Sequence, residues 1–320
     1  MIFTAENTLL IGSILLFVSI VVGKTGYRFG VPTLLLFLVV GMLFGSDGLG
    51  LQFHDAKDAQ FIGMVALSII LFSGGMDTKF KEIKPILGPG IVLSTVGVLL
   101  TALFTGLFIW WLSGMSWTNI YLPITTSLLL AATMSSTDSA SVFAILRSQK
   151  MNLKHNLRPM LELESGSNDP IAYTMTAIFI SLLQGSGSAG SIAYMIFAQV
   201  VYGFGIGVGI ALIGVFIVKR MNPETGAGFR MMFFLAFAML AYSIPVAVGG
   251  NGYLSVYIVG IIMGNAKLKG TADVMNFFDG VTAFMQILIF FLLGMLSTPA
   301  SFINVWIPAI LIAVFLTFVS

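Results

Sequence analysis

Long apolar runs, separated by short polar, glycine or proline breaks, make up almost the whole chain. Residues 33–45, 61–73, 91–112 and 192–218 carry no charged side chain, and the longest exceed the roughly 20 residues that a helix needs to cross a bilayer. This pattern predicts a single membrane domain over residues 1–320, with eleven helical spans. The predicted spans are residues 8–23, 31–47, 58–76, 86–113, 118–146, 155–184, 191–218, 229–247, 251–265, 274–297 and 302–320.

Composition excludes a soluble globular protein. Of the 320 residues, 58% are hydrophobic and 9% are charged, whereas soluble chains carry about 25% charged residues. A soluble fold of this size could not bury so much apolar surface. The absence of cysteine excludes disulfides and thiolate metal sites. We therefore expect an all-α polytopic membrane protein that contacts lipid and has no nucleic-acid partner.

The distribution of basic residues predicts the orientation in the membrane. If the N-terminus is outside, only Lys57 of the 15 Lys and Arg residues falls in an outer loop. Basic residues concentrate in the cytoplasmic loops of membrane proteins, and one missed span would scramble the pattern. The sequence therefore predicts a multi-pass protein of a bacterial-type inner (plasma) membrane with its N-terminus outside.

Most acidic residues lie at span ends or in loops, but four lie deeper inside predicted spans, where charge is costly. Asp138 falls in span 118–146, and Glu162, Glu164 and Asp169 fall in span 155–184. An ionisable group at membrane depth costs at least about 2.5–3.5 kcal/mol, so it usually faces a partner or a water-filled cavity and has a function. These residues are therefore the candidate site.

The segment around Asp138 is predicted to interrupt its helix. Residues 133–141 are almost all hydroxyl and carboxylate side chains between two apolar stretches. Hydroxyl side chains compete for backbone hydrogen bonds, and transporters use broken helices to direct carbonyl groups at an ion. The alternative is an intact helix that packs through small residues, with Asp138 bonded to a neighbour.

The polar residues of span 155–184 divide between two faces. At 100° per residue, Glu162, Ser165 and Asp169 share one face, whereas Glu164 and Asn168, four residues apart, share another. This helix is therefore expected to contact two partners. For Glu162, nearer the inner end, a role at the mouth of a cation pathway and a purely structural role both stay open.

A cation site can be assembled from these two spans. Pro170 removes one backbone hydrogen bond and should open a carbonyl near Asp169. Two neighbouring carboxylates would titrate as a coupled pair, and protonation would expel a bound monovalent metal cation. The predicted cation ligands are Asp169, Asp138, Ser165, Asn168 and the carbonyl of Thr137, with Asp169 and Asp138 supplying the charge. A structural hydrogen bond from Asp169 to span 118–146 is the alternative.

Three functions follow from this arrangement. The first is secondary antiport of K⁺ or Na⁺ against H⁺, and the second is a cation channel, although a channel would require a ring of filter carbonyls. The third is an intramembrane hydrolase with an aspartate dyad, for which no flanking motif is present. The sequence has no glycine-rich phosphate loop, so an ATP-driven pump is not supported. We expect no enzyme activity and no cofactor besides the transported ions.

Glycines mark two further positions. Gly203, Gly205, Gly207 and Gly209 recur along span 191–218, where they predict a close helix contact or, alternatively, a flexible linker. The Gly-Gly-Asn-Gly sequence at residues 249–252 is typical of a tight turn on the outer side.

Several of these motifs resemble those of the NhaP-like monovalent cation/proton antiporters. Residues 164–169, Glu-Ser-Gly-Ser-Asn-Asp, resemble the Glu-Ser-x-x-Asn-Asp motif of that family, and residues 137–138 resemble its Thr-Asp motif. Residues 290–294 resemble its Phe-x-x-Leu-Gly segment. Residues 277–280, Phe-Phe-Asp-Gly, look closer to the bacterial potassium/proton branch.

The resemblance implies a fold of thirteen helices built from two inverted repeats, with two crossed, broken helices in a mobile core and the other half forming a homodimer. It implies electroneutral, alternating-access exchange of one cation for one proton. By this likeness Asp169 is the exchanging carboxylate, Glu164 and Glu162 have structural or coupling roles, and the remaining site residues bind the ion or shape the site. They are Asp138, Thr137, Ser165 and Asn168.

The chain departs from the family pattern at three places. Ser139 stands where some members have proline, and Ser73 stands where relatives often carry an acid. No Lys or Arg is expected at membrane depth to pair with Glu164, and the second broken helix is missing. We therefore expect a chain that is incomplete at its C-terminal end, with eleven of thirteen spans, and that would not transport by itself.

Overall fold

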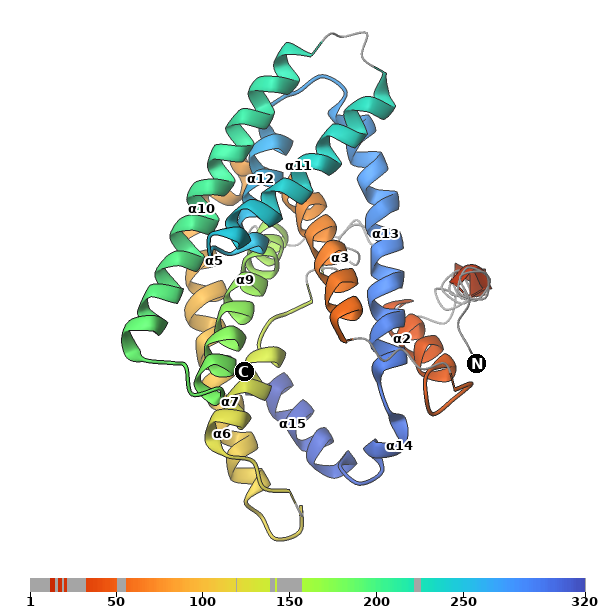
Figure 1. The fold of residues 1–320 in the computed structure, drawn as a ribbon, viewed down its shortest axis with the longest axis vertical. Coiled ribbons are helices and arrows are strands. Elements are labelled where there is room, and N and C mark those ends of the chain that lie inside the picture. Colours follow the sequence, from red (N-terminus) through yellow and green to blue (C-terminus); the bar gives the residue numbers. More distant parts are fainter. Residues whose placement is uncertain are drawn as a thin grey trace. The chain divides into compact units, whose positions relative to one another are not determined.

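Every regular element that the structure describes is a helix, as the apolar pattern predicts. The structure is a computed structural model that describes residues 12–14, 17–18, 20–21, 33–50, 56–118, 120–138, 142, 157–221 and 226–319 (Figure 1). The chain divides into two compact units. The first comprises Met1–Leu67 with Gly280–Trp306, and the second comprises Ser68–Asp279 with Ile307–Ser320. Most of predicted span 8–23 lies outside the described residues.

The first unit is held together by close contact between two helices. It contains α2 (Thr33–Phe44), the first part of α3 (Ala56–Asp77), the second part of α13 (Thr271–Leu296) and α14 (Pro299–Phe302). The backbones of α2 and α13 meet at Gly41 and Gly294, where neither position has room for a Cβ atom. Phe44 packs edge-on against Phe291, with ring centroids 6.4 Å apart. Small residues thus allow two apolar helices to approach closely.

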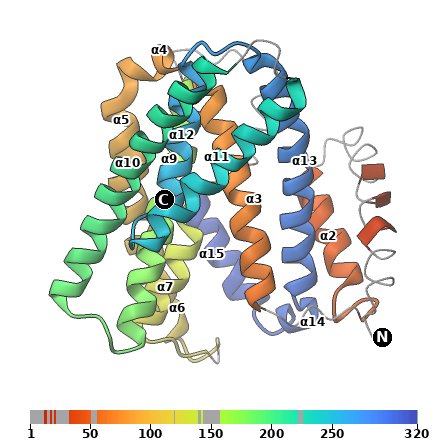
Figure 2. The same cartoon turned by 45° about the horizontal axis from the view of Figure 1, so that its top comes forward.

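The second unit contains most of the described helices, including α7 and α9 next to the candidate site. In chain order they are α4 (Phe80–Ile83), η2 (Lys84–Ile86), α5 (Leu87–Val92), η3 (Leu93–Gly97), α6 (Val98–Ser113), α7 (Ile124–Met134), α9 (Leu157–Leu183), α10 (Ala189–Arg220), α11 (Ala227–Ala247), α12 (Gly252–Asn265) and α15 (Trp306–Phe318). Helix α12 packs mainly on α10 and α11, and α7 packs on α6 and α9 (Figure 2).

The glycine row of α10 is a packing surface on one side only. A Cβ atom at Gly203 would lie 2.9 Å from the carbonyl oxygen of Asn251, and one at Gly207 would lie 3.0 Å from the Cα of Ser255. At Gly205 and Gly209 nothing lies within 4 Å. Close helix contact, rather than a flexible linker, therefore explains the two glycines that face α12.

Gly214, further along α10, allows a test of this packing. A Cβ atom there would lie 2.9 Å from the Phe237 ring of α11 and 3.2 Å from the Met263 sulfur of α12. We expect Gly214→Ala to destabilise the protein by about 1–3 kcal/mol through overpacking. Gly209→Ala is the matched control, because its Cβ enters open space. Melting temperatures in detergent check this, and equal melting temperatures for the two variants would contradict it.

Five helical stretches among the described residues are long and apolar enough to cross a membrane, judged by length and composition. They are Ala56–Asp77, Phe80–Ser113, Ala189–Arg220, Ala227–Ala247 and Thr271–Leu296. Helices α2, α7, α12 and α15 are shorter but also apolar. The chain is therefore a multi-pass membrane protein, whereas the assignment of all eleven spans within one domain stays a prediction.

Candidate functional site

The helix that precedes Asp138 is interrupted, as predicted. Helix α7 ends at Met134, and the Ser135 hydroxyl donates back to the Ala132 carbonyl at 2.9 Å. Residues 136–138 are not helical, and the Val142 amide donates to the Asp138 carbonyl at 3.0 Å beyond them. Serine and threonine hydroxyls that bond to nearby backbone favour such an ending. Ser139, where the chain departs from the family pattern, lies outside the described residues.

Helix α9 presents the other half of the site without a break. It runs from Leu157 to Leu183 and includes Pro170. Because proline has no N–H group, the carbonyl of Gly166, four residues earlier, lacks its usual intrahelical donor. The weakest turn of α9 therefore coincides with the acidic cluster, which is the location that the sequence predicted.

Thr137 is the centre of the contacts between the interrupted segment and α9. Its hydroxyl lies 3.2 Å from the Glu164 carboxylate and 3.2 Å from the Ser165 hydroxyl. It also accepts a hydrogen bond from the Asn168 amide at 2.6 Å. A threonine hydroxyl has one proton, so it can donate to Glu164 or to Ser165 but not to both at once. The Thr137 hydroxyl can therefore switch its hydrogen bond between Glu164 and Ser165 when the charge of the site changes.

Asn168 leaves one oxygen available in the buried part of the site. The side chain is fully buried, and its amide group donates to Glu164 at 2.9 Å, which confirms the predicted shared face. Its Oδ1 atom has no hydrogen-bond partner among the described residues. An unpartnered buried carbonyl oxygen is costly unless something binds there, and an oxygen is the ligand type that a hard cation prefers.

Asp169 meets the interrupted segment through Ser136. Its half-buried carboxylate accepts a hydrogen bond from the Ser136 hydroxyl. Sequence reasoning selected Thr137 and missed Ser136. The signal was present, because Ser136 belongs to the hydroxyl-rich run, but only the direction of a non-helical backbone decides which hydroxyl reaches Asp169.

The predicted pairing of Asp138 with Asp169 stays a prediction. Asp138 is exposed and ends the described part of its segment, next to residues 139–141, which lie outside the described residues. Within the ranges that the structure describes, no group of three or more His, Asp or Glu side chains could hold a metal ion. Figure 2 shows α9, which supplies the site residues Ser165, Asn168 and Asp169, and α7, which ends just before Thr137.

Glu162 belongs to a different environment, toward the start of α9. Its carboxylate forms an ion pair with Arg158 at 3.0 Å, and its carbonyl accepts a hydrogen bond from the Tyr257 hydroxyl at 3.2 Å. The face that Glu162 was predicted to share with Ser165 and Asp169 thus contacts more than one neighbour. These contacts supply a structural role, and its position at the mouth of a cation pathway stays a prediction.

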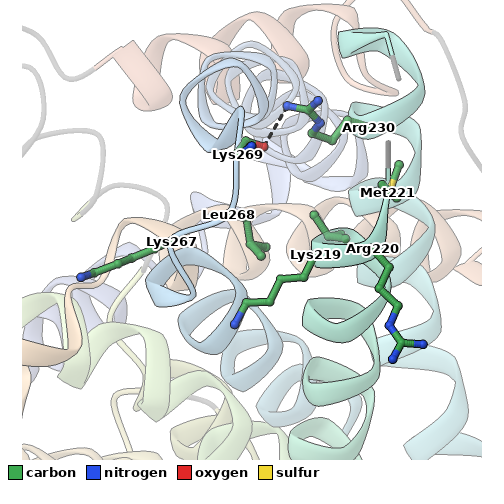
Figure 3. Close-up of a pocket in the computed structure, with 8 residues that line it drawn as sticks. Lys219, Arg220, Met221, Arg230, Lys267, Leu268 and Lys269 are labelled. Atoms are coloured by element: carbon green, nitrogen blue, oxygen red, sulfur yellow. Dashed lines mark hydrogen bonds between the residues drawn. The ribbon is translucent and has the colours of Figure 1, made fainter. Parts of the chain in front are cut away.

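A basic pocket lies at the ends of α10 and α12 and the start of α11. It has a volume of about 450 Å³ and is lined by Val218, Lys219, Arg220, Met221, Arg230, Lys267, Leu268 and Lys269. The Arg230 guanidinium donates to the Lys269 carbonyl at 2.8 Å, while the ends of Lys219, Arg220 and Lys267 point apart (Figure 3). These positive charges repel a cation and converge on no single point. They match loops that the charge pattern predicts to be cytoplasmic.

Comparison with known proteins agrees with the motifs. Residues 12–320 match the transmembrane sodium/hydrogen exchanger family. The K(+)/H(+) antiporter NhaP of Alkalimonas amylolytica is 35% identical over 98% of this chain and 53% of its own length. The K(+)/H(+) antiporter NhaP2 of Shewanella oneidensis is 35% identical over 95% of this chain and 52% of its own. The chain thus spans about half the length of the curated relatives it matches.

The fold agrees as well. The solved structure of the sodium proton antiporter MjNhaP1 from Methanocaldococcus jannaschii matches with a TM-score of 0.79 at 22% identity, over 98% of this chain and 76% of that one. The expected NhaP antiporter fold is therefore confirmed. Sequence motifs, the match over residues 12–320 and the fold together identify the chain as a member of the transmembrane sodium/hydrogen exchanger family.

Proposed function

We propose that this chain forms the ion-exchanging membrane part of a secondary antiporter that exchanges K⁺ or Na⁺ for H⁺. The observation that carries the proposal is the contact of Asp169 with Ser136 at the break after α7. The residue that precedes Asp169, buried Asn168, has an Oδ1 atom with no hydrogen-bond partner in the part of the chain that the structure describes. Relatives named K(+)/H(+) antiporters and a fold shared with a sodium proton antiporter support it.

The Ser136 hydroxyl can serve both states of Asp169. The hydroxyl donates to the Asp169 carboxylate, which is the hydrogen bond that a charged Asp169 requires. When Asp169 takes up a proton, the same hydroxyl can rotate and accept that proton in a hydrogen bond, because it has both a donor and lone pairs. Cation and proton thus compete for Asp169, and in either state the Ser136 hydroxyl keeps a hydrogen bond to the carboxyl group.

The neutral side chains complete the proposed ion shell. Asn168 Oδ1, the Ser165 hydroxyl and oxygens of Thr137 lie around the break and can replace the water that a cation leaves behind. Asp138 is proposed as the second carboxylate. Because Asn168 is neutral, one exchanging carboxylate at Asp169 accounts for one cation against one proton, so the exchange is proposed to be electroneutral.

The setting of this activity follows from the resemblance and the charge pattern. The proposed protein works by alternating access as a homodimer in a bacterial-type inner membrane, with its N-terminus outside. Within this chain, α9 and the interrupted segment after α7 are proposed to carry the exchange site. No cofactor besides the transported ions is proposed.

Exchange by the full-length protein in everted vesicles tests the function. A fluorescent pH probe should report proton movement on addition of KCl or NaCl, with saturable dependence on the cation. Choline chloride is the control. Collapse of the membrane potential should leave the rate unchanged if exchange is electroneutral. Single-channel currents across a planar bilayer would instead favour a channel and would contradict the proposal.

Thr137→Val tests the ligand shell. The change removes the hydroxyl that contacts Glu164, Ser165 and Asn168, so we expect the apparent KM for the cation to rise about tenfold, in line with the value of a hydrogen bond to a charged group. Thr133→Val is the matched control, because the exposed Thr133 hydroxyl donates only to the Leu130 carbonyl in the structure. An equal KM in both variants would exclude the Thr137 hydroxyl from the site.

A further inference from the structure

The turn before α12 reaches the middle of α9. Asn251, in the Gly-Gly-Asn-Gly sequence, is 2% exposed, and its Nδ2 atom donates to the Pro170 carbonyl at 2.9 Å. The two residues are 81 positions apart in the chain, and Pro170 directly follows Asp169. The sequence indicated only a tight turn here. The structure shows a buried contact with the helix that carries the candidate site.

Asn251 uses every polar atom of its side chain. Its Oδ1 atom accepts a hydrogen bond from the Leu254 amide at 3.0 Å and so caps α12. Its Nδ2 atom also lies 3.3 Å from the Thr174 hydroxyl, which itself donates to the Pro170 carbonyl at 2.8 Å. One side chain therefore joins the beginning of α12 to the turn of α9 that lacks a backbone hydrogen bond.

Tyr257 makes a second contact one to two turns further along α12. Its side chain is 2% exposed, and its hydroxyl donates to the Glu162 carbonyl at 3.2 Å. Its ring fills the space above Gly166, where a Cβ atom would lie 2.6 Å from the ring. Through this hydrogen bond Tyr257, like Asn251, contacts the backbone of α9. Neither hydrogen bond involves a proposed ligand side chain.

The two contacts enclose the acidic segment of α9. From Glu162 to Pro170 the helix rises about 12 Å. Glu164, Ser165, Asn168 and Asp169 all lie between these two points. The gap in backbone bonding that Pro170 causes also falls within this segment, so α9 can bend there unless other groups hold it.

We propose that Asn251 and Tyr257 are positioning residues that hold residues 162–170 of α9 at the depth and rotation at which Asp169 meets the interrupted segment after α7. This inference rests on the proposed function. Neither residue belongs to the proposed ligand set, so their removal should weaken cation binding through misplacement of α9 and leave the maximal rate nearly unchanged.

Asn251→Ser separates this role from capping. Serine caps a helix about as well as asparagine, but its side chain is too short to reach the Pro170 carbonyl. Asn265→Ser is the matched control at the other end of α12. There Asn265 donates to the Thr78 carbonyl at 2.8 Å and accepts from the Phe80 amide at 2.9 Å. Tyr257→Phe removes the second contact and keeps the ring.

The kinetic test uses the full-length protein in everted vesicles. For Asn251→Ser and Tyr257→Phe we expect the apparent KM for K⁺ or Na⁺ to rise about fivefold each, the value of one hydrogen bond, with the maximal rate within about twofold of wild type. Asn265→Ser should keep the wild-type KM. A wild-type KM in Asn251→Ser, or the same rise in Asn265→Ser, would overturn the inference.

Hydrogen exchange of the purified full-length proteins tests the inference without transport. Amides of residues 162–174 should lose protection in Asn251→Ser, because the bend at Pro170 becomes easier, and keep it in Asn265→Ser. Unchanged protection in Asn251→Ser would overturn the positioning role even if exchange is confirmed. Conversely, if Asn251→Ser loses protection relative to wild type but the wild type moves no cation, the positioning contact stands and the proposed function is refuted.

Discussion

Asp169→Asn is expected to abolish cation-dependent proton movement while the protein stays folded. Asparagine has nearly the same shape as aspartate, and its carbonyl oxygen can still accept the Ser136 hydroxyl. It cannot bind and release a proton, and it brings no charge to balance a cation. The substitution thus removes the competition between the two ions and keeps the contact between α9 and the segment after α7.

The measurement compares full-length wild type and Asp169→Asn in everted vesicles, with the pH probe and with KCl or NaCl. Asp273→Asn is the matched control, because Asp273 is an exposed aspartate in the first turn of α13. Melting temperatures in detergent establish that both variants fold. Residual saturable exchange in a folded Asp169→Asn protein would show that another group carries the proton.

The location of the site could be predicted from sequence because charge at membrane depth has few explanations. Glu164 and Asp169 stood out for that reason, and the four-residue spacing of Glu164 and Asn168 predicted the contact that the structure shows at 2.9 Å. The hydroxyl-rich run also predicted the end of α7 near Met134. Each inference used a regular helix period or a local competition for hydrogen bonds.

What sequence could not predict depends on backbone direction outside helices and on contacts between distant segments. Ser136 reaches Asp169 because the chain leaves the helix after Met134, where side-chain direction follows no fixed period. Asn251 lies in a sequence that is typical of any tight turn, and nothing local shows that this turn is buried against Pro170. Gly166 could be placed in a motif but not explained, because its neighbour Tyr257 is 91 positions away.

Gly166→Ala is expected to have the second largest effect, with loss of most exchange and destabilisation by up to about 3 kcal/mol. The new Cβ atom would lie 2.6 Å from two ring carbons of Tyr257 and 2.9 Å from its hydroxyl oxygen. The ring cannot move aside easily, because Tyr257 is buried in a cluster with Ile83 and Leu163. The clash should therefore push α9 away from α12, and with it Asp169.

A second substitution tests whether this clash is the cause. Tyr257→Leu removes the ring, so Gly166→Ala should cost less stability in the Tyr257→Leu background than in wild type, which is the non-additivity expected of residues in contact. Gly205→Ala is the control, because a Cβ atom there meets nothing within 4 Å. Equal costs in both backgrounds, measured as melting temperatures of the purified proteins, would show that Gly166 is required for another reason. A Gly166→Ala protein with wild-type stability and exchange would contradict the close packing of α9 on α12 itself.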